Sequence, residues 1–165
     1  MRTAIAGLSA GSCTAASAAG NAVVMLSPGT YSNMTFTASS IGMLSPGLYT
    51  VNGDVTFEGN TVVAGSGETI VPSGALNILN PATVTLTAPG ASPTGGAISG
   101  FVFVNTGTGS LTLSGSVTPN LTGVPYAPNT SLSITGSAGT AVTTCLEFIV
   151  NNATVTGAAS LGSGC

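Results

Sequence analysis

Five residues of this sequence carry a formal charge, and they are the first place to look for catalytic chemistry. The four acids are Asp54, Glu58, Glu68 and Glu147, and Arg2 is the one base. On an extended strand, Asp54 and Glu58 would lie on one face about 13 Å apart at the backbone, whereas the paired carboxyls of glycosidases are about 5–9.5 Å apart. Neither acid has a cation or a histidine near it in the sequence. We therefore interpret both as surface residues and predict no catalytic residue, no cofactor and no metal site.

Three cysteines offer thiol or disulfide chemistry. Cys145 and Cys165 are twenty residues apart, close to one coil of a stacked β-structure, in which such residues would lie about 4.8 Å apart and within reach of a disulfide. We expect this disulfide to staple the last coil, to contribute roughly 3 kcal/mol and to imply an oxidising compartment. The alternative is two buried thiols. Cys13 would be unpaired, buried, or bonded to another chain.

Threonine and serine alternate with apolar residues in several short stretches of the chain. On strands, the polar members would form one flat outward face. Its residues are Thr35, Thr37, Thr56, Thr112, Ser114, Ser133, Thr135, Thr154 and Thr156. Such a face can order water, as ice-binding surfaces do, although threonine is also simply a favourable polar residue for the solvent side of a strand. Glu58, Asn77 and Leu79 interrupt the pattern.

The overall composition excludes several classes of function. The chain has 165 residues, a net charge of −3, one basic residue and no histidine. One cation cannot replace the counterions of a nucleic acid, and the chemistry that depends on histidine is excluded with it. The longest apolar run covers residues 22–26, far short of the ~20 residues that span a bilayer. The length fits one domain with a substantial core.

A repeat in the apolar positions indicates which elements carry the threonines. The second inward residues of six alternating stretches are Phe36, Phe57, Ile78, Leu113, Ile134 and Val155, at spacings of 21, 21, 35, 21 and 21 residues. We expect the first three to form one inward ladder and the last three another. The long step contains an additional strand at Thr83–Thr87 and a loop near residues 88–100. Glycine or asparagine often follows a stretch and suits a sharp corner.

This period, with short strands and no helical periodicity, predicts an all-β fold, a right-handed parallel β-helix (β-solenoid) with coils of about 18–22 residues. A β-sandwich is the alternative, but it has no reason to keep a constant spacing of 21 residues. Residues 1–22 are rich in alanine, glycine and serine and are expected to form a cap, either an irregular first coil or a short helix. Residues 23–165 would form the solenoid, with the loop insertion near 88–100.

The second half of the chain resembles a known family. The ordered segments are residues 83–89 (TVTLTAP), 100–104 (GFVFV), 121–129 (LTGVPYAPN), 131–136 (SLSITG) and 144–150 (TCLEFIV), with a closing cysteine. Together with the PGTY turn at residues 28–31, they resemble the C-terminal region of bacterial TadG-like proteins, which are associated with Tad/Flp pilus assembly. FVFVN stands where that family has an aromatic-rich strand with Gln-Asp. The PGTY and Thr-x-Thr features also resemble bacterial ice-binding β-solenoids, although those proteins pack a long helix beside the solenoid.

The resemblance implies a bacterial, exported protein at the cell surface or outside the cell, associated with the envelope or the pilus. We expect a non-enzymatic structural or adhesive module without a cofactor. Its partners would be further copies of itself, as a head-to-tail oligomer or filament, or other envelope and pilus proteins. An ice-binding protein that uses the flat Thr/Ser face is the alternative. Neither nucleic acid nor a membrane span is expected in this segment.

Overall fold

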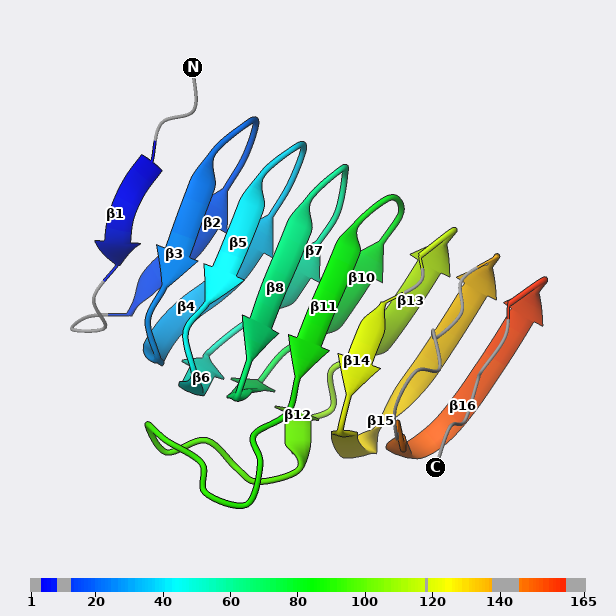
Figure 1. Cartoon of the computed structure of the whole chain (residues 1–165). Helices are drawn as coiled ribbons and strands as arrows, with labels where there is room; N and C mark the ends of the chain where they lie inside the picture. Colours follow the sequence, from blue (N-terminus) through cyan, green and yellow to red (C-terminus); the bar gives the residue numbers. More distant parts are fainter. Residues whose placement is uncertain (1–3, 9–12, 118, 138–145, 160–165) are drawn as a thin grey trace.

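The fold is a parallel β-solenoid, in which the chain winds through successive coils that stack along one axis (Figure 1). The structure is a computed structural model, and it describes residues 4–8, 13–117, 119–137 and 146–159. Every strand pairing among these residues is parallel, and no described residue is helical. The β-solenoid expected from the repeat is therefore confirmed, and the β-sandwich is excluded.

A six-stranded sheet forms one side of the coils from β1 to β14, which we call the first side. Its strands, in spatial order, are β1 (Ala4–Leu8), β3 (Val23–Leu26), β5 (Ile41–Leu44), β8 (Val62–Ser66), β11 (Thr83–Thr87) and β14 (Asn120–Thr122). Val23 pairs with Ile41, Ile41 with Val62 and Val62 with Thr83. One coil therefore takes 18 to 21 residues at this part of the solenoid.

The remaining strands form a ten-stranded sheet that covers two further sides. The second side contains β6 (Gly47–Val51), β9 (Glu68–Pro72) and β12 (Phe101–Val104). The third side contains β2 (Thr14–Ala18), β7 (Val55–Phe57), β10 (Leu76–Leu79) and β13 (Leu111–Gly115). Three long strands continue from the second side onto the third: β4 (Gly29–Phe36), β15 (Val124–Gly136) and β16 (Ile149–Gly157).

The predicted inward ladder is present and runs without a break through the third side. Successive rungs are Ala18, Phe36, Phe57, Ile78, Leu113, Ile134 and Val155, each paired with the next. The two ladders expected from the sequence are thus one. The step of 35 residues does not interrupt it because the additional residues leave the coil as a loop and return before β13.

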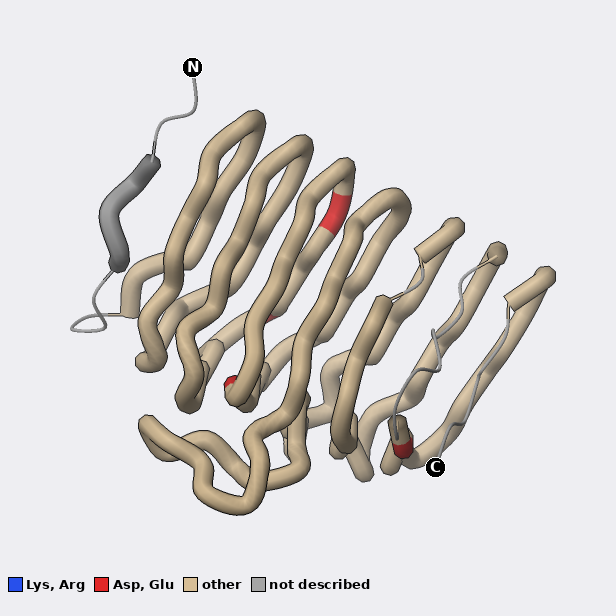
Figure 2. The backbone as a smooth tube through the Cα atoms, viewed as in Figure 1, with Lys and Arg blue, Asp and Glu red and all other residues tan. Residues whose placement is uncertain are grey.

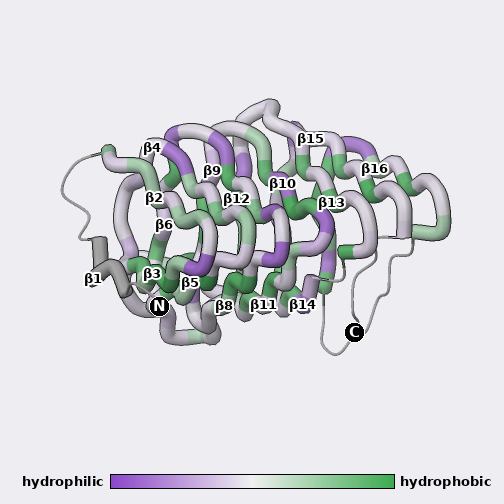
Figure 3. Tube along the Cα trace, turned by 90° about the horizontal axis from the view of Figure 1, so that it is seen from above, coloured by the Kyte–Doolittle hydropathy of each residue, from purple (hydrophilic) through white to green (hydrophobic). Residues whose placement is uncertain are grey.

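Two aromatic stacks fill the interior of the early coils. The rings of Tyr31 and Tyr49 lie 6.2 Å apart and nearly parallel, and those of Phe36 and Phe57 lie 5.9 Å apart. All four side chains are fully buried. Gly42 makes room for this packing, since a Cβ atom there would lie 2.7 Å from the ring of Phe36. In Figure 3 the apolar positions recur on successive coils, as this stacking requires.

The described residues near the start of the chain form strands rather than a helix. Of the expected cap at residues 1–22, residues 4–8 form β1, which pairs with β3, and residues 14–18 form β2, which pairs with β4. The short helix considered for this segment is therefore wrong for its described residues. Small side chains give weak alternation, but pairing with the next coil satisfies the backbone groups of these residues as strands.

The strand at Thr83–Thr87 is a regular part of its coil rather than an addition to it. β11 pairs with β8 on one side and with β14 on the other. The insertion is the loop of residues 88–100, which contains no strand and projects beside β12 (Figure 1). The loop is held by Thr69, whose hydroxyl accepts from the amide of Ile98 at 2.9 Å and donates to the carbonyl of Phe101 at 2.9 Å.

The predicted glycine corners are confirmed after the third side. Gly115, Gly136 and Gly157 pair in register at the ends of β13, β15 and β16, with φ angles of 87°, 81° and 81°. This left-handed conformation favours glycine. The asparagine corners include Asn105, which is buried and donates to the carbonyl of Gly74 in the preceding coil at 2.7 Å.

Candidate functional site

The inward ladder fixes an outward row of polar side chains on the third side. Since alternate residues of a strand point to opposite faces, the residues preceding each rung point outward. They are Ser17, Thr35, Thr56, Asn77, Thr112, Ser133 and Thr154, and each pairs with the next. Rungs of a parallel sheet are about 4.8 Å apart. The structure therefore brings five of the predicted Thr/Ser positions, together with Ser17 and Asn77, into one continuous row.

A second outward row follows each rung of the ladder. Leu79 pairs with Ser114, Ser114 with Thr135 and Thr135 with Thr156. Thr37 lies directly after β4, and the amide of Glu58 donates to the carbonyl of Phe36, which places Glu58 beside it. The two rows are about 6.7 Å apart along a strand. We call both rows together the threonine face.

The threonine face is regular in spacing and nearly uncharged. Its side chains are half-buried from β4 to β15, and Thr154 and Thr156 on β16 are exposed. Threonines, each with a hydroxyl and a methyl group, recur on it with Asn77, Leu79 and serines between them, and Glu58 is its one charged residue. A surface of this kind can order water or contact a flat solid, but it contains no nucleophile activated by a base.

The acids are dispersed over the molecule, as Figure 2 shows. Asp54 is exposed and accepts the amide of Ala75 at 2.7 Å, which joins two successive corners. Glu58 is half-buried and Glu147 is exposed. No group of three or more possible metal ligands occurs among the described residues. Arg2 lies outside them.

Glu68 is the functional group that the sequence analysis missed. It begins β9, it is completely buried, and neither carboxyl oxygen has a hydrogen-bond partner. Burial raises the pKa of Glu68 to about 7, and the nearby backbone groups of Glu68 and Thr87 oppose this shift only in part, without forming a hydrogen bond to the carboxyl oxygens. The signal in the sequence was weak but present. Residues 66–70 (SGETI) follow the first side as residues 45–49 (SPGLY) do one coil earlier, with glutamate in place of glycine.

Of the three cysteines, the structure describes Cys13. Cys13 is exposed and forms no disulfide, so its burial in a cap is wrong. The side-chain amide of Asn52 donates to its sulfur at 3.6 Å. Cys145 and Cys165 lie outside the described residues, so their disulfide stays a prediction.

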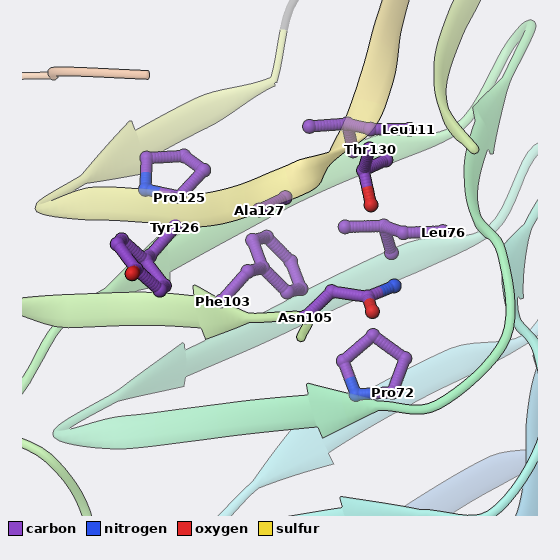
Figure 4. Close-up of a pocket in the computed structure, with 9 residues that line it drawn as sticks. All are labelled: Pro72, Leu76, Phe103, Asn105, Leu111, Pro125, Tyr126, Ala127 and Thr130. Atoms are coloured by element: carbon purple, nitrogen blue, oxygen red, sulfur yellow. The ribbon is translucent and has the colours of Figure 1, made fainter. Parts of the chain in front are cut away.

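An interior cavity lined by described residues is too small for a ligand. A small cavity of about 10 Å³ lies between β9, β12 and β15, lined mainly by apolar side chains such as Phe103, Leu111 and Pro125 (Figure 4). This space holds at most one water molecule. Asn105 and Thr130 are its polar neighbours. The side chain of Asn105 donates to the carbonyl of Gly74 and accepts from the amide of Gly107, and the hydroxyl of Thr130 donates to the carbonyl of Gly107.

The outer surface of the first side carries an apolar patch that the sequence analysis also missed. Met25, Met43 and Val62 are exposed on adjacent strands β3, β5 and β8. Further along the same face the outward residues are Thr83 and Thr85 of β11. The first side is therefore apolar near its beginning and threonine-rich further on.

The two ends of the third side differ in how well they are covered. At the beginning, Ala16 and Ala18 of β2 are buried. At the other end, residues 151–158 are all exposed, and the inward Val155 retains 43% of its accessible surface. β16 pairs with β15 on one edge, and no pairing of its other edge occurs among the described residues.

No protein-family model, no curated protein and no solved structure matches this chain. Among the described residues there is also no helix that is long and apolar enough to cross a membrane.

Proposed function

We propose that this chain is a non-enzymatic, extracellular structural and adhesive module that associates with copies of itself end to end. The observation that carries the proposal is the outer edge of β16, which pairs with no other strand among the described residues and along which residues 151–158 are exposed. A strand with an unpaired edge offers a row of N–H and C=O groups to another strand. The resemblance to TadG-like proteins supports an envelope or pilus location.

The opposite end of the solenoid offers a matching strand. β2 pairs only with β4 among the described residues. If β16 of one copy paired with β2 of the next, the outward row would continue from Thr154 to Ser17, and the inward ladder from Val155 to Ala18. Such a contact joins two different surfaces, so it builds an open filament or a ring.

The test compares two exposed valines that differ in position. Val155 lies on the uncovered strand β16 and is 43% exposed, and Val62 lies in the middle of the first side and is 40% exposed. We expect the unaltered protein to form oligomers whose size rises with concentration in light scattering. Val155→Lys should abolish them because it places a charge at the junction, whereas Val62→Lys should not. A monodisperse monomer at high concentration, or equal effects of both substitutions, would contradict the proposal.

A second candidate function is ice binding, and the register of the threonine face favours it. Thr35, Thr56, Thr112, Ser133 and Thr154 lie in one row, with Asn77 between Thr56 and Thr112. Hydroxyl and methyl groups at such intervals can hold ordered water. Thermal hysteresis and inhibition of ice recrystallisation test it directly. Thr112→Lys should abolish such activity, whereas Thr85→Lys on the first side is the control. No activity of the unaltered protein would exclude this candidate.

A further inference from the structure

Glu68 lies at a corner whose residues differ from those at the same corner of the preceding coil. It pairs with Gly47 of the preceding coil, and Ile70 pairs with Tyr49. The hydroxyl of Tyr49 is buried and donates to the carbonyls of Leu26 and Ser45, both at 2.8 Å. Ile70 has no hydroxyl with which to repeat these bonds. The corner at β9 thus has a carboxyl group and lacks the O–H donor that Tyr49 provides in the preceding coil.

The surroundings of Glu68 disfavour a negative charge. A buried carboxylate needs a cation or several hydrogen bonds to be stable, and no lysine, arginine or histidine occurs among the described residues. The titratable group that interacts with Glu68 is Tyr49 on β6, whose own pKa burial raises, with Tyr31 on β4 beyond it. β8 and β11, which pack against the same corner, contribute no titratable side chain. The neutral acid is therefore the form that fits the folded corner.

Gly65 provides the space that this side chain occupies. A Cβ atom at Gly65 would lie 2.7 Å from both the carboxyl carbon and the Oε2 atom of Glu68. The same glycine lines a shallow hollow on the outer surface of the first side, together with Met43, Pro46 and Thr85. Gly65 is thus in contact with the carboxyl group inside the solenoid and with the surface hollow outside it.

We propose that Glu68 is a pH-sensitive latch that holds the corner between β8 and β9 closed when its carboxyl is neutral and lets it open when the carboxyl ionises. An ionised carboxylate is stabilised most by contact with water. Gly65 has no side chain that would block its way to the surface hollow. Opening would place a negative charge on the first side, which carries no charged side chain on its strands from β3 to β14. The solenoid is thereby locally tight in acid and loosened above neutral pH.

The direction of the effect follows from proton linkage. Glu68 has a pKa of about 7 in the folded protein, above its ordinary value of 4.5. Between these two pH values the folded state holds a proton that the unfolded state releases. The contribution of Glu68 to the free energy of unfolding is therefore fully present below about pH 4.5 and is lost as the pH rises through 7. The equilibrium constant for unfolding should rise on the order of 100-fold across this window from Glu68 alone.

The experiment compares Glu68→Gln, which keeps the shape and removes the charge, with Glu58→Gln on the half-buried outer surface. Urea unfolding followed by circular dichroism from pH 4 to pH 9 should show falling stability in the unaltered protein and in Glu58→Gln. The fall should be largely absent in Glu68→Gln. Equal pH dependence in all three proteins would overturn the proposal.

Hydrogen exchange distinguishes a local latch from a general loss of stability. After correction for the intrinsic exchange rate, amides of β8 and β9 should exchange faster at pH 8.5 than at pH 5.5 in the unaltered protein. Amides of β13 should not change, and Glu68→Gln should remove the difference. A uniform change over all coils would contradict a latch at this corner, even if Glu68 titrates.

Discussion

The two ends of the solenoid show how the same alternating pattern leads to different burial. Met34 and Phe36 alternate with polar residues on β4, and Ala153 and Val155 do the same on β16. Phe36 is fully buried because coils lie on both sides of it, whereas Val155 is 43% exposed. The pattern thus decides the direction of a side chain, and the neighbouring coil decides whether that side chain is buried.

The coils also differ in the side chains that fill their interiors. The early coils contain the Tyr31–Tyr49 stack, whose hydroxyls donate to backbone carbonyls of the corners. The later rungs are the aliphatic Leu113, Ile134 and Val155. Aliphatic packing is non-directional, whereas a buried hydroxyl must meet its acceptor. We therefore expect the early coils to unfold last and the final coil to open first.

The largest effect should come from a charge inside the ladder. Ile134→Asp removes a fully buried side chain between Leu113 and Val155 and leaves a carboxylate without a partner. The cost should be about 5 kcal/mol or more, comparable with the whole stability of a small domain. Circular dichroism should show loss of the cooperative transition. Thr135→Asp, one residue further and facing outward, should stay folded, and equal losses would mean that the strand parity is wrong.

The inward ladder was the part of the fold most accessible from the sequence. A rung has an apolar side chain, a threonine or serine beside it and a corner after it. The positions of Phe57 and Ile134 can therefore be predicted from several features of the sequence at once. The same signals gave the outward rows, because the register of one face of a strand fixes the other. The loop of residues 88–100 could also be predicted, because its proline and glycine content excludes a regular strand.

The parts that were missed depend on contacts that the sequence does not display. Ala16 and Ala18 are too small to give an alternating signal, and their strand is defined by pairing with β4. The burial of Glu68 is not visible in the sequence, because it requires the absence of a side chain at Gly65 in the preceding strand β8. Met25 and Met43 face outward through their register with each other, although apolar residues ordinarily predict burial.

The next effect in size concerns the predicted staple of the last coil. Removal of a Cys145–Cys165 disulfide by serine substitution of both residues should lower stability by roughly 3 kcal/mol. Mass spectrometry of the non-reduced protein should show the link, and reductant should lower the thermal midpoint of the unaltered protein but not that of the double serine variant. Cys13→Ser is the control, since Cys13 is exposed and unpaired. A link between Cys13 and Cys145 would contradict the one-coil spacing.

A smaller effect tests the corner bonds of the early coils. Tyr49→Phe removes one hydroxyl and leaves the carbonyls of Leu26 and Ser45 without this donor. The expected loss is about 1–2 kcal/mol in urea unfolding. Tyr126→Phe, in a half-exposed ring that packs edge-on against Phe101, is the control and should cost less. If both substitutions were neutral, the hydroxyl bonds would not distinguish the early coils.

The smallest effect should come from truncation at the uncovered end. Val155→Ala removes two methyl groups from a side chain that is already 43% exposed, so the loss of stability should be about 0.5 kcal/mol or less when monomeric. Ile134→Ala, one rung inward and fully buried, should cost about 2–5 kcal/mol. Urea unfolding at a concentration too low for association measures both. The difference between them should shrink at high concentration if copies stack on β16, because Val155 is then buried. A large cost of Val155→Ala in dilute solution would mean that another segment of the same chain covers the last coil.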